Sequence, residues 1–330
     1  MSSTFWGDGL FLIYFAYGLA FYSLGLALLV ESGRTSELSL VRTMRLLAAF
    51  GLLHGLHEWL DLLDLNLERH YDIVFPHWAA WLRLSLLVAS FLALLAFGEG
   101  LLKYAPHHKT PSWWLTIGAL GWYTVSAIAV RLLYNLDDAA WLEVACNLAR
   151  YVIGVPGALL ACVGLWRQRT IFRERGMGLF AKDLTLAAIA IALYGVVGQF
   201  ITAESRIFPS NIIHQDLFFD VFGFPIQLFR TVVAAIVAVS MIRVLQAFEI
   251  ENRQRIEAIE RRGREELSQA NKEVEHLLEE VQRREMLRGA LLQRTTAAQE
   301  AERQRIAREL HDDTGQALTG LAMGLRGMSR

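Results

Sequence analysis

The sequence predicts an all-α protein in which seven transmembrane helices are followed by a long cytoplasmic coiled coil. Three observations lead to this prediction. Of the 330 residues, 54% are hydrophobic, and the mean hydropathy is +0.33. Apolar runs of membrane length recur up to about residue 245, and charged residues dominate the chain after it. The net charge of -1 conceals this division between a lipid-facing and a water-facing part.

Each of the seven apolar runs is long enough to cross a bilayer, which takes about 20 mostly apolar residues in a helix. The runs lie at residues 9–30, 40–60, 79–98, 113–134, 144–166, 183–203 and 217–245. Asp8 precedes the first run, and the N-terminus lacks the basic stretch and small-residue cleavage site of a secretory signal. We therefore expect the first run to be retained as a membrane helix.

Basic residues between the runs predict the orientation of the bundle. The loops after the first, third and fifth runs are rich in them, whereas the opposite loops hold only Arg69 and Arg206 among many acidic residues. The basic residues are Arg34, Arg42, Arg45, Lys103, Lys109, Arg167, Arg169, Arg173, Arg175 and Lys182. Because cytoplasmic loops are enriched in lysine and arginine, the N-terminus is expected outside and the C-terminus in the cytoplasm.

The second run carries a polar face that is unusual for a membrane helix. His54, His57, Glu58 and Asp61 fall within about 100° of arc on one side of a helix. Such a face is expected to point into the bundle, since a charged side chain facing lipid is costly. Two imidazoles and two carboxylates could bind zinc or copper, contribute to a haem site or relay protons. They could equally pair with arginines of neighbouring helices.

Other polar residues could meet this face inside the bundle. Glu143, Asn147 and Arg150 share one side of the fifth run, and a side of the seventh run carries Asp216, Asp220, Gln227 and Arg230. We expect these polar faces to converge on the second run.

Residues 246–300 are predicted to form a coiled coil that continues from the last membrane helix. Leu267, Val274, Leu277 and Val281 are among the apolar or small residues that recur there at spacings of three and four. A lone helix would leave this stripe in water, so we expect a parallel homodimer. Pro225 lies inside the seventh run and is expected to kink that helix.

Residues 306–318 read IARELHDDTGQAL and place a histidine in a helical context close to residue 330. His311 lies at the edge of an apolar stripe and should be reachable from water. Gly315, four residues later, is expected to leave space around the imidazole, where a side chain would crowd it. Asp312 could hold one ring nitrogen protonated and raise the nucleophilicity of the other, and Gln316 could position a water molecule.

The stretch ERQRIARELHDDTGQALTGL resembles the phosphoacceptor helix of bacterial two-component sensor histidine kinases, in the subclass of the nitrate-responsive sensors. The resemblance covers some 20 residues and is nearly free of gaps. It implies that His311 accepts the γ-phosphoryl group of ATP and that Asp312 is the neighbouring acid/base. It also implies that Asp312 and Gln316 together dephosphorylate the partner response regulator. The chain would then lie in the bacterial inner membrane.

The resemblance also implies parts that the sequence does not contain. Kinases of this kind have a second hairpin helix and an ATP-binding domain, and no glycine-rich nucleotide loop occurs before Arg330. We expect the 330 residues to be part of a longer kinase, to bind neither ATP nor Mg²⁺ themselves and to be inactive alone. The fold class is then seven transmembrane helices, a coiled coil and the first helix of a dimerisation and phosphoacceptor hairpin.

The predicted domains are a sensor at 1–245, a signalling coil at 246–300 and a partial phosphotransfer helix at 301–330. The expected partners are the lipid bilayer, a second copy of the chain and a response regulator. Direct nucleic-acid binding is not expected, because glutamates match the arginines of the coil. Two other functions fit the membrane half alone: a transporter with a cytoplasmic assembly coil, and a membrane protein that binds metal or haem.

Overall fold

The computed structural model describes residues 2–31, 39–71, 76–103, 113–174 and 178–328. These residues form helices, with one isolated β-bridge between Thr202 and His214, so the all-α prediction is confirmed for the described part of the chain. The chain divides into two compact units, Met1–Asn252 and Arg253–Arg330.

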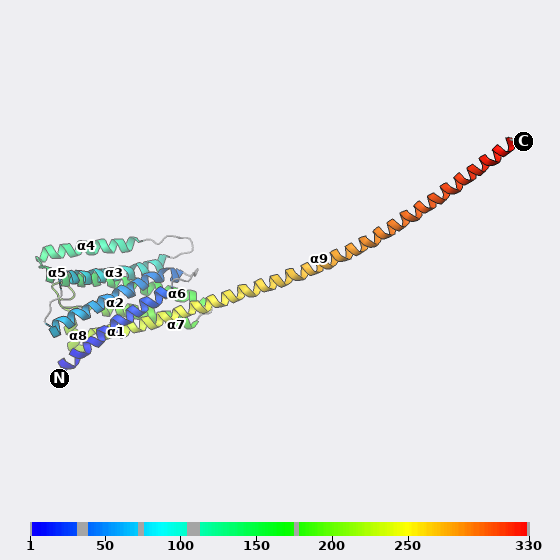
Figure 1. The fold of residues 1–330 in the computed structure, drawn as a ribbon. Helices are drawn as coiled ribbons and strands as arrows, with labels where there is room; N and C mark the ends of the chain where they lie inside the picture. The colour runs from blue at the N-terminus through cyan, green and yellow to red at the C-terminus, as the bar shows by residue number, and fades with distance from the viewer. Residues whose placement is uncertain (1, 32–38, 72–75, 104–112, 175–177, 329–330) are drawn as a thin grey trace. The chain divides into compact units, whose positions relative to one another are not determined.

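The first unit is a bundle of helices (Figure 1). Seven helical segments are long and apolar enough to cross a membrane, and each overlaps one of the seven predicted runs. The helices are α1 (Ser2–Glu31), α2 (Ser39–Tyr71), α3 (His77–Lys103), α4 (Trp114–Tyr134), α5 (Asp138–Ala149), α6 (Val155–Glu174), α7 (Gly178–Leu193), α8 (Gln215–Phe222) and α9 (Ile226–Met328). The π-helical turn Arg150–Gly154 joins α5 to α6 in one span, and a second, Tyr194–Gly198, extends α7.

Neighbouring helices of the bundle pack in a regular order: α1 on α2, α2 on α3, α3 on α6 and α6 on α7. The contact between α1 and α2 is close enough to require glycine. A Cβ atom at Gly51 would lie 2.6 Å from the carbonyl oxygen of Phe21, and one at Gly25 would lie 2.6 Å from the backbone nitrogen of Leu52. Small residues are the usual means by which membrane helices approach each other closely.

The start of the last span differs from the prediction. Residues 217–245 do not form one helix, because α8 ends at Phe222 and Gly223 adopts a left-handed conformation with φ of 76°. Pro225 immediately precedes α9, where the missing N–H of proline costs no helical hydrogen bond. The expected kink at Pro225 is therefore wrong: this proline lies just before the first residue of α9.

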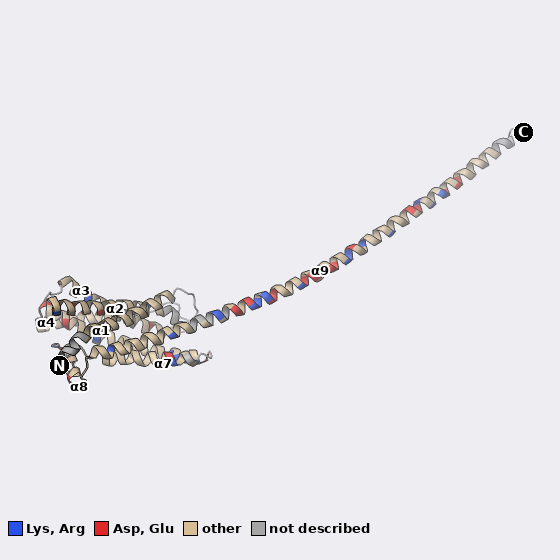
Figure 2. Ribbon diagram, turned by 60° about the horizontal axis from the view of Figure 1, so that its bottom comes forward, with Lys and Arg blue, Asp and Glu red and all other residues tan. Residues whose placement is uncertain are grey.

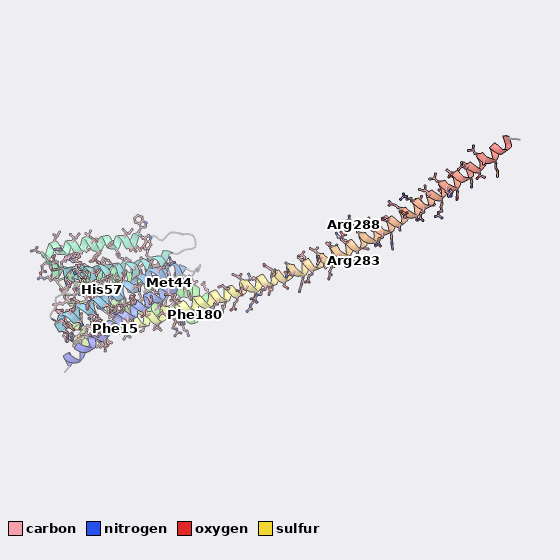
Figure 3. All side chains as sticks on the ribbon, viewed as in Figure 1. Phe15, Met44, His57, Phe180, Arg283 and Arg288 are labelled. Carbon is pink, nitrogen blue, oxygen red and sulfur yellow. The ribbon has the colours of Figure 1, made fainter. Side chains whose placement is uncertain are left out.

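The second unit consists of the later part of α9, which is marked by alternating basic and acidic residues in Figure 2. Salt bridges join residues one turn apart along it, such as Arg284 to Glu280 at 2.6 Å. The apolar side chains of Leu277, Val281 and Leu291 are all more than half exposed in the single chain. Figure 3 labels two arginines of this helix, Arg283 and Arg288, and both are exposed.

Candidate functional site

His54 lies at the centre of the bundle, in a hydrogen-bond chain that uses both of its ring nitrogens. Ser90 Oγ donates to the carbonyl oxygen of Leu87 at 2.7 Å, so its oxygen can accept from His54 Nδ1 at 3.1 Å. The Nε2 atom then accepts from the Tyr194 hydroxyl at 2.6 Å. His54 is fully buried, and a neutral imidazole satisfied in this way stabilises the packing of α2 against α3 and α7.

His57, one turn later on α2, is buried but only half satisfied. Its Nδ1 donates to the carbonyl oxygen of Arg83 on α3 at 3.1 Å, whereas its Nε2 has no hydrogen-bond partner. The closest charged group is Asp61, with Oδ2 3.6 Å from Nε2. Figure 3 shows His57 within the bundle.

The carboxylate of Asp61 is paired with an arginine from a neighbouring helix. Arg83 Nε lies 3.3 Å from Asp61 Oδ1, and Arg83 Nη1 donates to Asp64. The three side chains are each about a quarter exposed. The alternative in which the polar face of α2 pairs with arginines is therefore observed for Asp61.

The polar faces of three spans converge on one cavity of about 790 Å³ in the bundle. His57 and Asp61 line it from α2, Asn147 and Arg150 from the fifth span, and Gln227 and Arg230 from the start of α9. The predicted convergence is confirmed for these residues, but Asp216 and Asp220, which lie on α8, do not line the cavity. Glu68, His77 and Glu143 also line the cavity and are exposed, so the cavity reaches the surface of the bundle.

The predicted metal-ligating residues do not form a compact ligand set in this arrangement. His54, His57, Glu58 and Asp61 do not place three ligand atoms within 4.8 Å of one another, and a metal at His54 would have to displace Tyr194 or Ser90. Among the described residues, the set that meets this distance is Glu204, His214 and Asp216, near the β-bridge. Metal or haem binding by the α2 face stays a prediction.

His311 lies on the later part of α9, in the second unit. Its side chain is exposed, as are those of Asp312 and Gln316, and the three border one shallow concavity of the helix surface. Helical geometry places Gln316 one turn beyond Asp312, on the same side. The structure therefore brings the three predicted residues together on an open surface that another protein domain can reach.

The expected role of Gly315 is wrong. A Cβ atom at this position would meet no atom within 4 Å, so a small side chain would not crowd the imidazole of His311. Gly315 and Gly320 instead line the same concavity as His311, where the absence of their side chains leaves open space.

The turn before His311 carries a charge cluster formed by Arg305, Glu302 and Glu309. Arg305 bonds Glu302 at 2.6 Å and Glu309 at 2.8 Å. The hydrogen bond from Arg305 lowers the pKa of the Glu302 carboxyl below its ordinary value. All three side chains are exposed, so these pairs add little to helix stability.

This segment is also the part of the chain that resembles known proteins. Residues 302–330 match the family model HisKA_3, described as histidine kinase. The match contains His311, Asp312 and Gln316, and it supports a histidine kinase phosphoacceptor domain with a role in two-component signalling. Comparison with the curated proteins and with the solved structures gives no match.

Several residues of the bundle site could not be predicted from the sequence. Tyr194 bonds His54 across 140 positions of sequence, and Tyr14 and Cys146 line the cavity without belonging to any polar pattern. The group of Glu204, His214 and Asp216 was also missed, because its members come together only through the turn closed by the β-bridge.

Proposed function

We propose that the chain is the sensor and phosphoacceptor part of a membrane-embedded histidine kinase of the nitrate-sensor subclass. The observation that carries this proposal is the match of residues 302–330, which contains a solvent-exposed His311 with Asp312 and Gln316 beside it. The seven apolar helices support a sensor at residues 1–245. Because α9 includes both the last span and His311, one helix belongs to the sensor and to the phosphoacceptor segment.

The exposed surface around His311 suits a two-step phosphotransfer. In the first step an imidazole nitrogen of His311 attacks the γ-phosphorus of ATP, and ADP leaves. Asp312 is the acid/base that manages the imidazole proton. ATP and Mg²⁺ are held by the ATP-binding domain of the full-length kinase. In the second step the phosphoryl group passes to a response regulator, and Gln316 positions the water that later removes it from that partner.

Two copies of the chain are expected to act together. The stripe of Leu277, Val281 and Leu291 remains more than half exposed in one chain, so covering it in a dimer would contribute part of the about 1.5–3 kcal/mol that complete burial of each such side chain gives. A parallel coiled coil over residues 246–300 would cover the stripe and bring the two His311 segments of 301–330 side by side. Nucleic acid is not among the direct partners that we propose.

The basic residues between the spans support a multi-pass location in a bacterial inner membrane. Arg45, Arg167 and Arg173 are among those on the proposed cytoplasmic side, while Asp64 and Glu68 lie at the opposite end of α2 with the mouth of the cavity. In this orientation the N-terminus is periplasmic, and the stimulus reaches the bundle from the periplasm or from the membrane.

The test is phosphorylation of the full-length protein in membranes. Membranes from producing cells are incubated with Mg²⁺ and radiolabelled ATP, and the label is mapped by acid and alkali treatment followed by peptide analysis. We expect an acid-labile, alkali-stable label that is absent from His311→Gln. The matched control is His276→Gln, which changes another exposed histidine of α9 and should keep the label. Labelling that persists in His311→Gln would refute the proposal.

A further inference from the structure

Two arginines in the wall of the cavity lack a carboxylate partner. Arg150 donates to the side-chain oxygen of Gln199 at 2.6 Å, and Arg230 donates to the carbonyl oxygens of Gly198 and Ile201, both at 2.6 Å. Within the described residues, no carboxylate oxygen lies within 4.0 Å of either guanidinium group. Both side chains are more than nine-tenths buried.

This arrangement leaves two buried guanidinium groups without an ion pair at contact distance. Glu58 and Asp61 act on Arg150 only from a longer range, and Asp61 is already paired with Arg83. A buried cation without a counterion is costly, and more so in a membrane than in water. The guanidinium groups therefore favour a negatively charged oxygen ligand in the cavity, which they can bind through several N–H donors.

The wall of the cavity that α2 contributes offers hydrogen-bond acceptors, whereas the arginines offer donors. His57 Nε2 is buried without a partner, and because Nδ1 donates to a carbonyl oxygen, the neutral ring presents Nε2 as an acceptor. The Oδ1 atom of Asp61 also lacks a hydrogen bond of good geometry, although Arg83 is nearby. Both residues line the same cavity as the two arginines. These acceptors favour a hydrogen-bond donor on the ligand.

We propose that the cavity binds a small carboxylate that also carries an amine or hydroxyl group. The carboxylate lies against Arg150 and Arg230, and the amine or hydroxyl donates to His57 and Asp61. The cavity volume of about 790 Å³ is in the usual range of small-molecule sites, about 300–1,000 Å³. Binding does not depend on phosphotransfer; only the role of this compound as the stimulus rests on the proposed function.

The test is direct binding to the full chain in nanodiscs of uncharged, zwitterionic lipid, measured by isothermal titration calorimetry. The probes are the standard amino acids, L-lactate and L-malate, with acetate and ethanolamine as compounds that carry only one of the two groups. We expect saturable binding of at least one amino or hydroxy acid, and weaker binding of acetate and ethanolamine. Loss of a charged hydrogen bond in Arg150→Gln should weaken binding by about tenfold to a hundredfold.

Three variants distinguish a lost contact from a damaged fold. Arg150→Lys keeps the charge and should bind better than Arg150→Gln, and His57→Gln should weaken the amino or hydroxy acid more than acetate. Arg131→Gln is the control, since Arg131 pairs with Asp138 outside the cavity and should bind as the parent protein does. Absence of saturable binding for every probe would overturn the proposal.

Two further outcomes would also overturn it. Acetate that binds as tightly as the best amino or hydroxy acid would show that the α2 acceptors take no part. Stabilisation by phosphatidylglycerol nanodiscs, with no binding of the soluble probes, would assign the arginines to a lipid headgroup. Each of these results is independent of whether His311 becomes phosphorylated, so binding and kinase function can fail separately.

Discussion

Arg83 should contribute much more to the stability of the bundle than a more exposed arginine at the bundle surface does. Replacing it in Arg83→Gln leaves Asp61 and Asp64 without their common cation, although each carboxylate is only about a quarter exposed. Breaking a fully buried pair costs about 3–5 kcal/mol, and an exposed pair contributes about 0–1 kcal/mol. For this intermediate burial we expect a loss of about 2–3 kcal/mol in the free energy of unfolding.

The assay is equilibrium unfolding of the purified protein in mixed micelles of detergent and sodium dodecyl sulfate. The matched control is Arg131→Gln, because Arg131 bonds Asp138 at 2.6 Å but both side chains are more than 40% exposed. That control should lose less than about 1 kcal/mol. The double variant Arg83→Gln/Asp64→Asn should recover part of the loss, since it removes one stranded carboxylate. Equal losses in the two single variants, or no recovery in the double variant, would refute the reasoning.

Three other predictions follow from particular residues. Gly51→Ala should destabilise the bundle by about 1–3 kcal/mol, because its Cβ would lie 2.6 Å from a backbone oxygen, whereas Gly121→Ala, with open space around it, should gain up to about 1 kcal/mol. The same unfolding assay compares the two variants, and equal stability would show that the contact between α1 and α2 leaves space for a Cβ atom. Gln316→Ala should slow dephosphorylation of the radiolabelled response regulator while leaving phosphorylation of the kinase unchanged; an unaltered rate of phosphate loss would count against its role. The metal hypothesis predicts stoichiometric zinc or copper, or a haem absorption band, that disappears in His54→Ala/His57→Ala, while colourless, metal-free parent protein would eliminate it.

The helical spans could be predicted from the sequence because hydropathy and length are local properties. All seven predicted runs overlap a span of the structure. The failure at Pro225 has an equally local cause. An apolar stretch that contains a proline fits either a kinked helix or two helices, and the backbone conformation of Gly223 decides between them. Apolar composition alone does not reveal that conformation.

The bundle site could be predicted only in part. Helical spacing correctly placed His57 and Asp61 on one face, and it correctly indicated that Arg150 faces the same region. Spacing could not reveal that Ser90 and Tyr194 occupy both nitrogens of His54, since these partners are 36 and 140 positions away. Which polar atoms remain without a partner is a property of packing between helices, so it required the structure.

The His311 segment was recognisable for a different reason. Its chemistry depends on residues within two turns of one helix, so the sequence contains the whole arrangement. The family match at residues 302–330 supports that interpretation without any information from the bundle. Gly315 is the exception, because the available space around a position depends on side-chain directions that spacing does not fix.

The first turns of α9 show how a molecule in the cavity can affect the helix that carries His311. Gln227 and Arg230 line the cavity, and both belong to α9, which runs to Met328. A bound molecule shifts α9 only if it has different affinities for two arrangements of that helix, and a difference of about 1.4 kcal/mol changes their ratio tenfold. The bonds from Arg230 to Gly198 and Ile201 hold the present arrangement. A carboxylate ligand that draws the guanidinium away from these carbonyl oxygens has such a difference, whereas one that binds Arg150 alone touches no residue of α9.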